Sequence, residues 1–341
     1  MERLPVYDDI ISFQSLYKAH RRARQGKRHK KEVIEFELNL AENLWQLHYQ
    51  LKYKTYRVGE YRRFMIYRPK TREIQAISYR DRVVQHSLCD NCLIPLLDRR
   101  LIYDNCACRK KKGTDKCLDR LSVFLQRHYK GHGEQGYFVK ADVSKFFDNI
   151  DHCVLKEKLK KLPLDDDTFW LVSTVIDSYR HPSGKGIPKG NQSSQCFALY
   201  YLDCVDRSVK EKLRISYYVR YMDDIIAVVG EKATGNKCLT IVDDILGNNR
   251  LLLNPKSQIV KLKNGICFLG WKIYVTENGR IVRKITHSAK KRIISRLKER
   301  RFLSMEERTQ VIASYKGHLS RGDAHNFYCK VANLIKMKAG I

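Results

Sequence analysis

The most constraining feature of the chain is a pair of acidic residues between two apolar segments. The tetrapeptide Tyr221–Asp224 separates Ile215–Val219 from Ile225–Val229 and ends in Asp223 and Asp224. Apolar, β-rich segments of this length, joined by a short polar tip, predict the two strands of a hairpin. Two carboxylates a few Å apart repel, and each raises the pKa of the other unless a cation neutralises them. The pattern therefore predicts half of a metal site, whereas an isolated Asp-Asp pair would be only a polar turn.

A third carboxylate occurs in a matching context upstream. Gly136–Asp142 is a short apolar strand that ends in Asp142, and Phe146 and Phe147 follow it. Carboxylate oxygens suit Mg²⁺, which fills its remaining positions with water or substrate phosphate. Together the strand-end aspartate, the two aromatic residues and the acidic hairpin resemble the palm of reverse transcriptases. The resemblance implies two Mg²⁺ ions, or Mn²⁺ in their place, about 3.5–4 Å apart.

The same resemblance assigns the metal ligands and an acid catalyst. Asp142 and Asp223 would be direct metal ligands, and Asp224 would be a weaker or indirect one. The segment Leu253-Asn254-Pro255-Lys256 places Lys256 where these polymerases often have a proton donor to the leaving pyrophosphate. Lysines are abundant in this chain, so the sequence specifies Lys256 only weakly.

Residues that bind the incoming nucleotide are assigned in the same way. Phe147 lies five residues after the strand-end aspartate, where the family has an aromatic side chain that would clash with a 2′-hydroxyl. That hydroxyl distinguishes ribonucleotides from deoxyribonucleotides. Alternatively, Phe146 and Phe147 are both core residues, and we expect one of them to be. Gly190 and Gln195 precede a helical run expected at Cys196–Leu213. Glycine permits an unusual φ at position 190. The segment resembles the family's template- and nucleotide-positioning loop. Alone, this segment would be a turn before a helix.

Two basic segments resemble the finger motifs that hold the triphosphate. Lys70 and Arg72 lie in Arg68–Ile74, and Arg109 lies in Cys108–Gly113. A guanidinium fork binds phosphate oxygens bidentately, which makes these residues candidates for triphosphate binding. For Arg109 the alternative is a solvated basic loop.

A second hairpin, expected within Asn264–Trp271, resembles the element that grips the 3′ end of the primer. We expect the primer 3′-hydroxyl held there to attack the α-phosphate of a deoxynucleotide. The residues assigned to this primer grip are Phe268, Leu269, Gly270 and Trp271.

The charge of the chain predicts a polyanionic partner. Its 66 Lys and Arg residues exceed its 37 Asp and Glu residues, which leaves a net charge of +29. Between Lys18 and Lys31 there are eight basic residues and no acidic one, and between Arg283 and Arg301 there are nine with only Glu299 opposing them. Both segments predict basic amphipathic helices. One such face is usually only solvated, but two at opposite ends of a chain favour a nucleic-acid channel.

The sequence predicts an α+β fold of the right-hand polymerase class, with fingers, a palm built on an antiparallel sheet, and a short helical thumb. The 341 residues exceed one compact core, so subdomains are expected. We expect an N-terminal helical extension at 1–56, fingers at 57–135 with helices in 152–185 returning to them, a palm at 136–279 and a thumb at 280–341. Ser304 and Glu307 form a capping box at the start of the second of three thumb helices, expected at 286–300, 304–320 and 323–337.

The eleven cysteines are expected to be reduced thiols. The N-terminus lacks a signal-peptide pattern, and no segment approaches the ~18 apolar residues of a membrane helix. The sequence thus predicts a cytoplasmic protein, bacterial or phage-encoded, without a membrane partner. Cys89-x-x-Cys92 with Cys106-x-Cys108 leaves a zinc site as the alternative to buried thiols.

The subgroup within the family is less well specified. Gly190-x-x-x-Ser194-Gln195 is similar to the pattern of diversity-generating retroelement enzymes, but Lys189 stands where that branch usually has an aliphatic residue. Antiphage defence-associated or retron-like reverse transcriptases are therefore the alternative. The resemblance implies a structured template RNA encoded nearby, a cDNA product, deoxynucleotides, and a small basic accessory protein or second subunit. A non-catalytic RNA-binding protein with a retained palm is disfavoured, because such a protein has no need for three uncompensated carboxylates.

Overall fold

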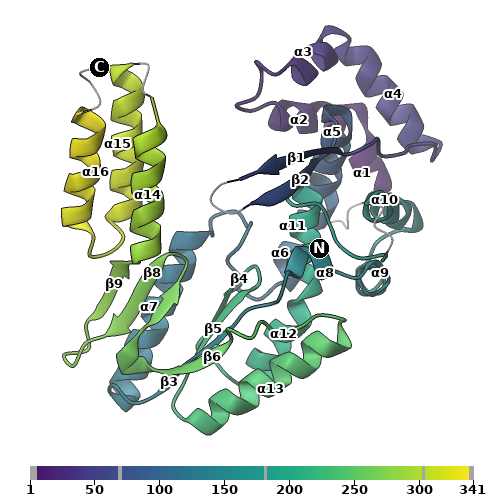
Figure 1. Cartoon of the computed structure of the whole chain (residues 1–341). Coiled ribbons are helices and arrows are strands. Elements are labelled where there is room, and N and C mark those ends of the chain that lie inside the picture. The colour runs from purple at the N-terminus through teal and green to yellow at the C-terminus, as the bar shows by residue number, and fades with distance from the viewer. Residues whose placement is uncertain (1–5, 68–70, 180–182, 302–303, 338–341) are drawn as a thin grey trace. The chain divides into compact units, whose positions relative to one another are not determined.

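The computed structural model of the chain describes residues 6–67, 71–179, 183–301 and 304–337 (Figure 1). The chain forms two compact units, each assembled from three segments. The first unit comprises Met1–Arg109, Val143–Ser208 and Val242–Asn254, and the second comprises Lys110–Asp142, Val209–Ile241 and Pro255–Ile341.

The first unit is mainly helical and carries one two-stranded sheet. The strands β1 and β2 pair in antiparallel register from Arg62↔Ala76 to Ile66↔Arg72. Its elements are α1 (Tyr7–Ile11), α2 (Phe13–Ala23), α3 (Lys31–Leu38), α4 (Leu40–Lys52), β1 (Arg62–Ile66), β2 (Arg72–Ala76), α5 (Tyr79–Leu88), the π-helix η1 (Cys89–Leu93), α6 (Ile94–Arg100), α8 (Phe146–Asn149), α9 (His152–Leu159), α10 (Asp166–Asp177), α11 (Gln192–Tyr201) and α12 (Asp203–Arg207).

The core of the first unit lies between α5, α2 and α11. The helix α5 packs against both of the others and buries Val83, Val84 and Leu88 completely. The helix α11 contributes Phe197 and Ala198, which are also buried. Burial of these apolar side chains is the main force that fixes the loop before α11 relative to α5.

The second unit contains two antiparallel sheets and a group of C-terminal helices. The first sheet has the strand order β4-β5-β3-β6, and the second has the order β7-β8-β9. The elements are α7 (Thr114–His132), β3 (Tyr137–Ala141), β4 (Tyr218–Tyr221), β5 (Asp224–Val229), β6 (Gln258–Lys261), the 3₁₀-helix η3 (Leu262–Asn264), β7 (Ile266–Phe268), β8 (Trp271–Val275), β9 (Ile281–Ile285), α14 (His287–Glu299), α15 (Met305–Leu319) and α16 (His325–Met337). The π-helix η2 (Ser208–Lys212) and the helix α13 (Lys232–Asn248) contribute residues to both units.

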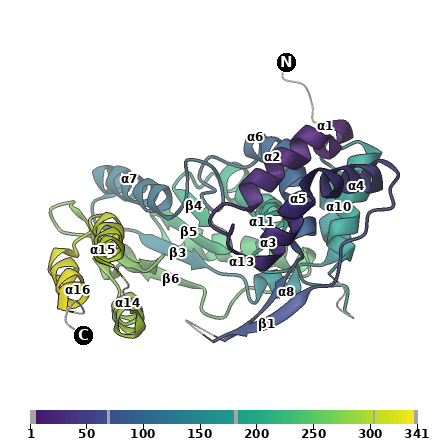
Figure 2. The ribbon, with the colours of Figure 1, turned by 90° about the horizontal axis from the view of Figure 1, so that it is seen from above.

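Helices cover the four-stranded sheet of the second unit. The helix α7 packs against β4 and β5 through its buried face, which includes Leu121 and Leu125. Gly235 of α13 lies close to β3 and β6, because a Cβ there would be 3.3 Å from Val139 and 3.2 Å from Ile259. Figures 1 and 2 show α14, α15 and α16 side by side, and α16 packs against both of the others.

The three C-terminal helices agree with their predicted positions. The Ser304 hydroxyl accepts a hydrogen bond from the Glu307 backbone N–H at 3.1 Å, which confirms Ser304 as the N-cap of α15. The helical run predicted from Cys196 is interrupted at Leu202, between α11 and α12.

The prediction of one basic amphipathic helix over Lys18–Lys31 is wrong. The helix α2 ends at Ala23, and α3 begins only at Lys31. Gly26 has φ +67°, a left-handed conformation that a helix interior excludes. In the other basic segment, β9 contains Arg283 and Lys284, and the helix starts only at His287.

The cysteines are all free thiols. Cys89, Cys92 and Cys106 are buried, whereas Cys108 is exposed. Within the described residues, no group of three or more His, Cys, Asp or Glu side chains could hold a metal ion, so the zinc alternative receives no structural support. Among the described helices, none has the length and hydropathy needed to span a membrane.

Candidate active site

The acidic hairpin of the second unit has a tight, two-residue turn. Tyr221 and Asp224 form the last pair of β4 and β5, so Met222 and Asp223 alone make the turn. Met222 has φ +59°, which is uncommon for a residue with a side chain and costs about 1–3 kcal/mol. Strain of this kind persists only where surrounding contacts hold the backbone in place.

A buried arginine provides such a contact. Arg220 lies on β4 with 0% of its surface exposed, although β4 is otherwise apolar and aromatic. Its guanidinium donates a hydrogen bond from Nη1 to the Met222 carbonyl oxygen at 2.8 Å. Burial raises the pKa of Asp223, and the positive charge of Arg220 opposes this rise. Arg220 therefore both holds the strained turn and favours the charged form of the carboxylate on it.

The third carboxylate lies at the same end of the sheet. The strand β3 pairs with β5 in antiparallel register, and Ala141 is the partner of Ile225. One position further along, this register places Asp142 opposite Asp224. The Asp142 backbone N–H donates to the Ser257 hydroxyl at 3.2 Å, just before β6 begins. The structure thus brings Asp142, Asp223 and Asp224 together within one unit.

The electrostatics of the three carboxylates are unfavourable without a cation. Burial is the main cause that raises the pKa of Asp223 to about 6, and the charges of Asp142 and Asp224 add to it. Burial also raises the pKa of Asp224, and Asp142 adds to this shift, while the positive charge of Lys140 opposes it. Lys140 donates from Nζ to the Cys267 carbonyl oxygen at 2.9 Å.

The donor set at this end of the sheet fits a hard divalent cation. It consists of carboxylate oxygens whose charged forms repel, and a divalent ion between them would remove that repulsion. Among the described residues, no group of three His, Cys, Asp or Glu side chains could hold a metal ion unaided. Mg²⁺ does not require three such ligands, because it binds one or two protein carboxylates and takes water or phosphate for the rest.

Lys256 lies in the same unit, one residue before Ser257. Its side chain is exposed, and the Ser257 hydroxyl accepts the hydrogen bond from the Asp142 backbone. Lys256 is therefore the chain neighbour of the residue that accepts a hydrogen bond from the Asp142 backbone. Its role as a proton donor stays a prediction.

The second predicted hairpin is formed by β7 and β8. Phe268 and Trp271 pair at its end, so Leu269 and Gly270 make a two-residue turn, with φ +49° and +88°. Positive φ at both turn residues is typical of a type I′ hairpin. The Gly270 carbonyl accepts hydrogen bonds from the Thr286 backbone N–H at 3.0 Å and from its hydroxyl at 3.1 Å, which connects the turn to the start of α14.

In the first unit the two consecutive phenylalanines have different environments. Phe146 is buried and contacts Tyr201, with ring centroids 6.4 Å apart. Phe147 is only half-buried and packs edge-to-face on Phe146 at 5.6 Å. Phe146 is thus the core aromatic residue, and Phe147 is the one left with accessible ring surface.

The predicted nucleotide-positioning loop is bonded to the helix that carries Phe147. The Ile187 backbone N–H donates to the Phe147 carbonyl at 2.9 Å, and the Lys189 ammonium pairs with the Asp148 carboxylate at 2.7 Å. Gly190 has φ +105°, so the prediction of an unusual backbone conformation there is confirmed. These contacts fix the distance between the loop and Phe147.

Gly190 and Gln195 line a polar cavity of about 340 Å³ within the first unit. The other lining residues are Asn191 and Gln192 of the same segment, with Lys27, Ile77, Arg82, Gln85 and His86 from elsewhere in the chain. Burial lowers the pKa of His86, so this ring favours its neutral form more than a free histidine does.

Of the three predicted triphosphate-binding residues, the structure describes the side chain of Arg109 alone. The Arg109 guanidinium donates to the Asp98 carboxylate at 2.6 Å and to the carbonyls of Ile102 and Asn105, and only 8% of the side chain is exposed. These contacts of Arg109 hold the neighbouring loop in place, and its binding to a triphosphate stays a prediction. Lys70 lies outside the described residues, and of Arg72 the structure describes only the backbone, in β2.

Sequence reasoning did not single out Arg220 or Lys140. Each is a charged residue inside a short apolar strand, Tyr218–Tyr221 or Tyr137–Ala141. Burying a charged side chain in a strand costs free energy unless a partner compensates the charge. A basic residue in an apolar strand close to an aspartate was therefore the sequence signal that could have identified Arg220 and Lys140.

Comparison with known protein families identifies the group to which this architecture belongs. Residues 65–273, more than half of the chain, match the family model described as "Reverse transcriptase (RNA-dependent DNA polymerase)". The chain belongs to this reverse transcriptase family. Enzymes of the family are RNA-directed DNA polymerases, that is, nucleotidyltransferases. A comparison with curated proteins found no significant match.

The fold also matches solved structures. One is a telomerase from Candida albicans in complex with a fragment of telomeric RNA, with a TM-score of 0.52 and 14% sequence identity. The match covers 84% of this chain and 59% of the telomerase chain. At this level of identity the match shows a shared fold, in agreement with the predicted α+β class of right-hand polymerases.

Proposed function

We propose that this reverse transcriptase synthesises cDNA on a dedicated structured RNA by two-metal nucleotidyl transfer. The observation that carries the proposal is the grouping of Asp142, Asp223 and Asp224 at one end of the β4-β5-β3-β6 sheet. Bound Mg²⁺, or Mn²⁺, would supply charge neutralisation and polarise the phosphate oxygens. A purely RNA-binding protein would gain nothing from keeping these repelling, half-buried carboxylates together.

The residues of the chain then have distinct tasks. Asp142 and Asp223 would hold the ions, Asp224 would support them, and Arg220 keeps the turn between the strands in place. The hairpin closed by Phe268 and Trp271 holds the primer terminus, and its connection to α14 through the Gly270 carbonyl limits its movement.

On the substrate side, the first unit selects and positions the nucleotide. The accessible face of Phe147 excludes a 2′-hydroxyl, and Phe146 packs edge-to-face against this ring. Gly190 and Gln195 contact the nascent base pair from the wall of the polar cavity. Lys256 donates the proton that the leaving pyrophosphate requires.

A basic groove in the second unit supports nucleic-acid binding by the C-terminal helices. It lies between α14 and α16, with a volume of about 690 Å³. Its lining includes four lysines and a phenylalanine: Lys290, Lys291, Lys298, Lys330 and Phe327. Glu299 is the acidic residue among the lining. Lysines at this density attract a phosphate backbone independently of its sequence.

For the subgroup, we propose an enzyme of the diversity-generating retroelement type. The Gly190, Ser194 and Gln195 pattern supports it, and a small basic accessory protein or second subunit that helps hold the RNA belongs to this proposal. The observation that favours the alternative, a defence-associated or retron-like enzyme, is Lys189. Its ammonium is paired with Asp148, beside Phe147, where the other branch would have an aliphatic contact.

Sequencing of the cDNA made on the native RNA tests the subgroup. Errors concentrated opposite template adenines support the diversity-generating assignment. Uniformly faithful or repetitive products contradict it and favour the defence-associated alternative.

A further inference from the structure

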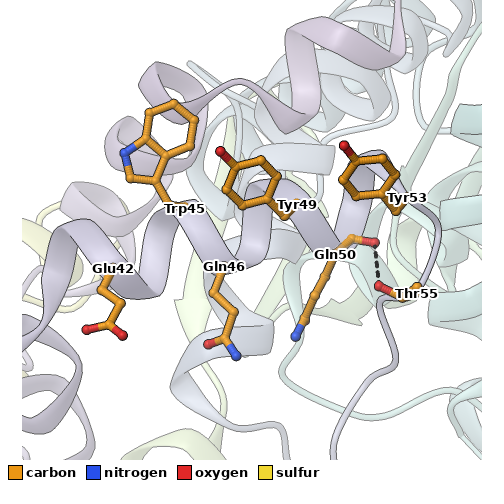
Figure 3. A pocket seen from close by; sticks show the side chains of 7 residues that line it. All are labelled: Glu42, Trp45, Gln46, Tyr49, Gln50, Tyr53 and Thr55. Carbon is orange, nitrogen blue, oxygen red and sulfur yellow. Dashed lines mark hydrogen bonds between the residues drawn. The ribbon is translucent and has the colours of Figure 1, made fainter.

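An aromatic row lies on the exposed side of α4 in the first unit. Trp45, Tyr49 and Tyr53 follow one another at intervals of four residues, so they stand one above the other along the helix and its C-terminal end. Their side chains are 45%, 50% and 66% exposed, respectively. Figure 3 shows the three rings side by side, with Gln46 and Gln50 on the neighbouring side of the helix.

The rings are held in nearly parallel planes. The centroids of Trp45 and Tyr49 are 5.8 Å apart with an angle of 28° between the planes. For Tyr49 and Tyr53 the values are 6.4 Å and 12°. Phe13, the first residue of α2, contacts Trp45 at 5.0 Å and supports that end of the row. The row is thus ordered before any ligand arrives.

The fold does not need these rings for its core. The buried face of α4 consists of Leu44, Leu47 and Leu51, each with 0% exposure. The aromatic row occupies a different face, so its replacement by polar residues would leave the core contacts unchanged. Contiguous exposed apolar surface of this kind usually marks an interaction site.

We propose that Trp45, Tyr49 and Tyr53 form a stacking platform for the unpaired bases of a single-stranded RNA. Aromatic faces accept every base, because every base has a π-face, and such platforms bind single strands with little sequence preference. Stacked carbon atoms need about 3.5–4 Å between them, so two neighbouring rings at these distances leave no room for a base between them. Each ring instead offers its outer face, and successive bases lie along the row.

The hollow beside the rings places an exposed amide next to the aromatic faces. The lining residues are aromatic, amide, hydroxyl or acidic, and none is aliphatic: Glu42, Trp45, Gln46, Tyr49, Gln50, Tyr53 and Thr55. The exposed Gln46 amide can donate to and accept from base edges.

The charges near the row complement a phosphate backbone. The Lys52 ammonium lies 5.9 Å from the centre of the Tyr53 ring. The helix α2 packs against α4 and begins the basic segment Lys18–Lys31, in which Lys18 and Arg21 are exposed. Phosphates that follow bases stacked on the row would pass close to the Lys52 ammonium, and Glu42 is the acidic residue among the lining.

Binding of labelled RNA to the full-length protein tests the platform. In the presence of EDTA, a fluorescein-labelled 12-nucleotide RNA that cannot pair should bind the wild-type protein, and each of Trp45→Ala, Tyr49→Ala and Tyr53→Ala should weaken this binding by about 5- to 150-fold. Tyr49→Phe and Tyr53→Phe retain the ring and should bind within about twofold of wild type. Tyr103→Ala removes an exposed tyrosine of the same unit and should have no effect. The affinity for a fully paired RNA duplex should not change.

A second measurement follows the ring itself. Addition of the unpaired RNA should quench tryptophan fluorescence in the wild-type protein, and Trp45→Phe should remove most of this quenching, because the other two tryptophans are Trp170 and the buried Trp271.

The platform is overturned if the triple alanine variant binds unpaired RNA as wild type does, or if duplex binding falls by the same factor. It is also overturned if the variants change only the molar mass of the protein assembly measured by light scattering. That result would show that the aromatic row mediates contact between protein chains. The proposal goes beyond the polymerase site, because the row and the three carboxylates belong to different units. RNA binding in EDTA is independent of catalysis, so Asp223→Asn should bind the RNA normally even where it makes no cDNA.

Discussion

Replacement of Asp223 by asparagine should make the metal-free protein more stable at neutral pH. The pKa of this carboxyl rises from its ordinary value of 3.8 to about 6, mainly through burial. A folded-state pKa above the unfolded one means that stability is highest at low pH and falls as pH rises from about 4 through 6. The shift corresponds to about 3 kcal/mol as an upper bound, and partial solvent access at the turn reduces this to about 1–2 kcal/mol. Asparagine carries no charge and avoids this loss.

Thermal unfolding of wild type and Asp223→Asn in EDTA measures the effect. At pH 7.5 we expect the variant to melt higher, by roughly 2 °C or more per kcal/mol. At pH 4 the difference should vanish, because the wild-type carboxyl is then protonated. Asp243→Asn, an exposed carboxylate on α13, serves as the matched control and should show no gain. An unchanged melting temperature at pH 7.5, or an equal gain at both pH values, would refute the reasoning.

Further substitutions test the other parts of the site. Phe147→Ala should increase incorporation of ribonucleotides relative to deoxyribonucleotides by at least about tenfold in single-nucleotide extension, and unchanged discrimination would remove Phe147 from that role. Arg220→Gln should lower kcat by about 10- to 100-fold and move the acidic limb of the pH–rate profile upward, because Arg220 holds the turn and lowers the pKa of Asp223; a loss of stability with a normal pH profile would contradict this. Lys189→Ile should raise misincorporation opposite adenine in sequenced cDNA, and an unchanged error spectrum would separate Lys189 from fidelity. Gly190→Ala should cost about 1–3 kcal/mol in urea unfolding, because an alanine at φ +105° is strained, and a neutral result would contradict the described loop.

Strong local patterns in the sequence were enough to predict the acidic hairpin. The β-branched and aromatic residues on both sides of Asp223-Asp224 specify strands, and the structure places β4 and β5 there. The strand predicted before Asp142 is also present, as β3, and its aromatic and β-branched residues Tyr137, Phe138 and Val139 favour a strand. The N-cap of α15 follows from a hydroxyl and a glutamate three residues apart, a signal that acts within one turn of helix.

Features that depend on distant contacts could not be predicted in this way. The bracing of Arg109 by Asp98 requires the intervening loop to fold back, and no local pattern encodes that. Within Lys18–Lys31 the charge pattern suggested one helix, but Gly26 adopts a left-handed φ and the helix ends before it. The buried Arg220 was hidden among apolar neighbours, and its meaning emerged only from the position of the Met222 carbonyl. Backbone conformation in turns and loops, rather than charge or hydropathy patterning, decided each of these cases.

The central claim is that the grouped carboxylates catalyse DNA synthesis on RNA. Primer extension on an RNA template with Mg²⁺, with wild type and Asp223→Asn compared at equal concentration, tests it most directly. We expect wild type to extend the primer with deoxynucleotides and the variant to lose extension by at least about a thousandfold, while both bind the primer-template. Equal extension by the two proteins would contradict the account.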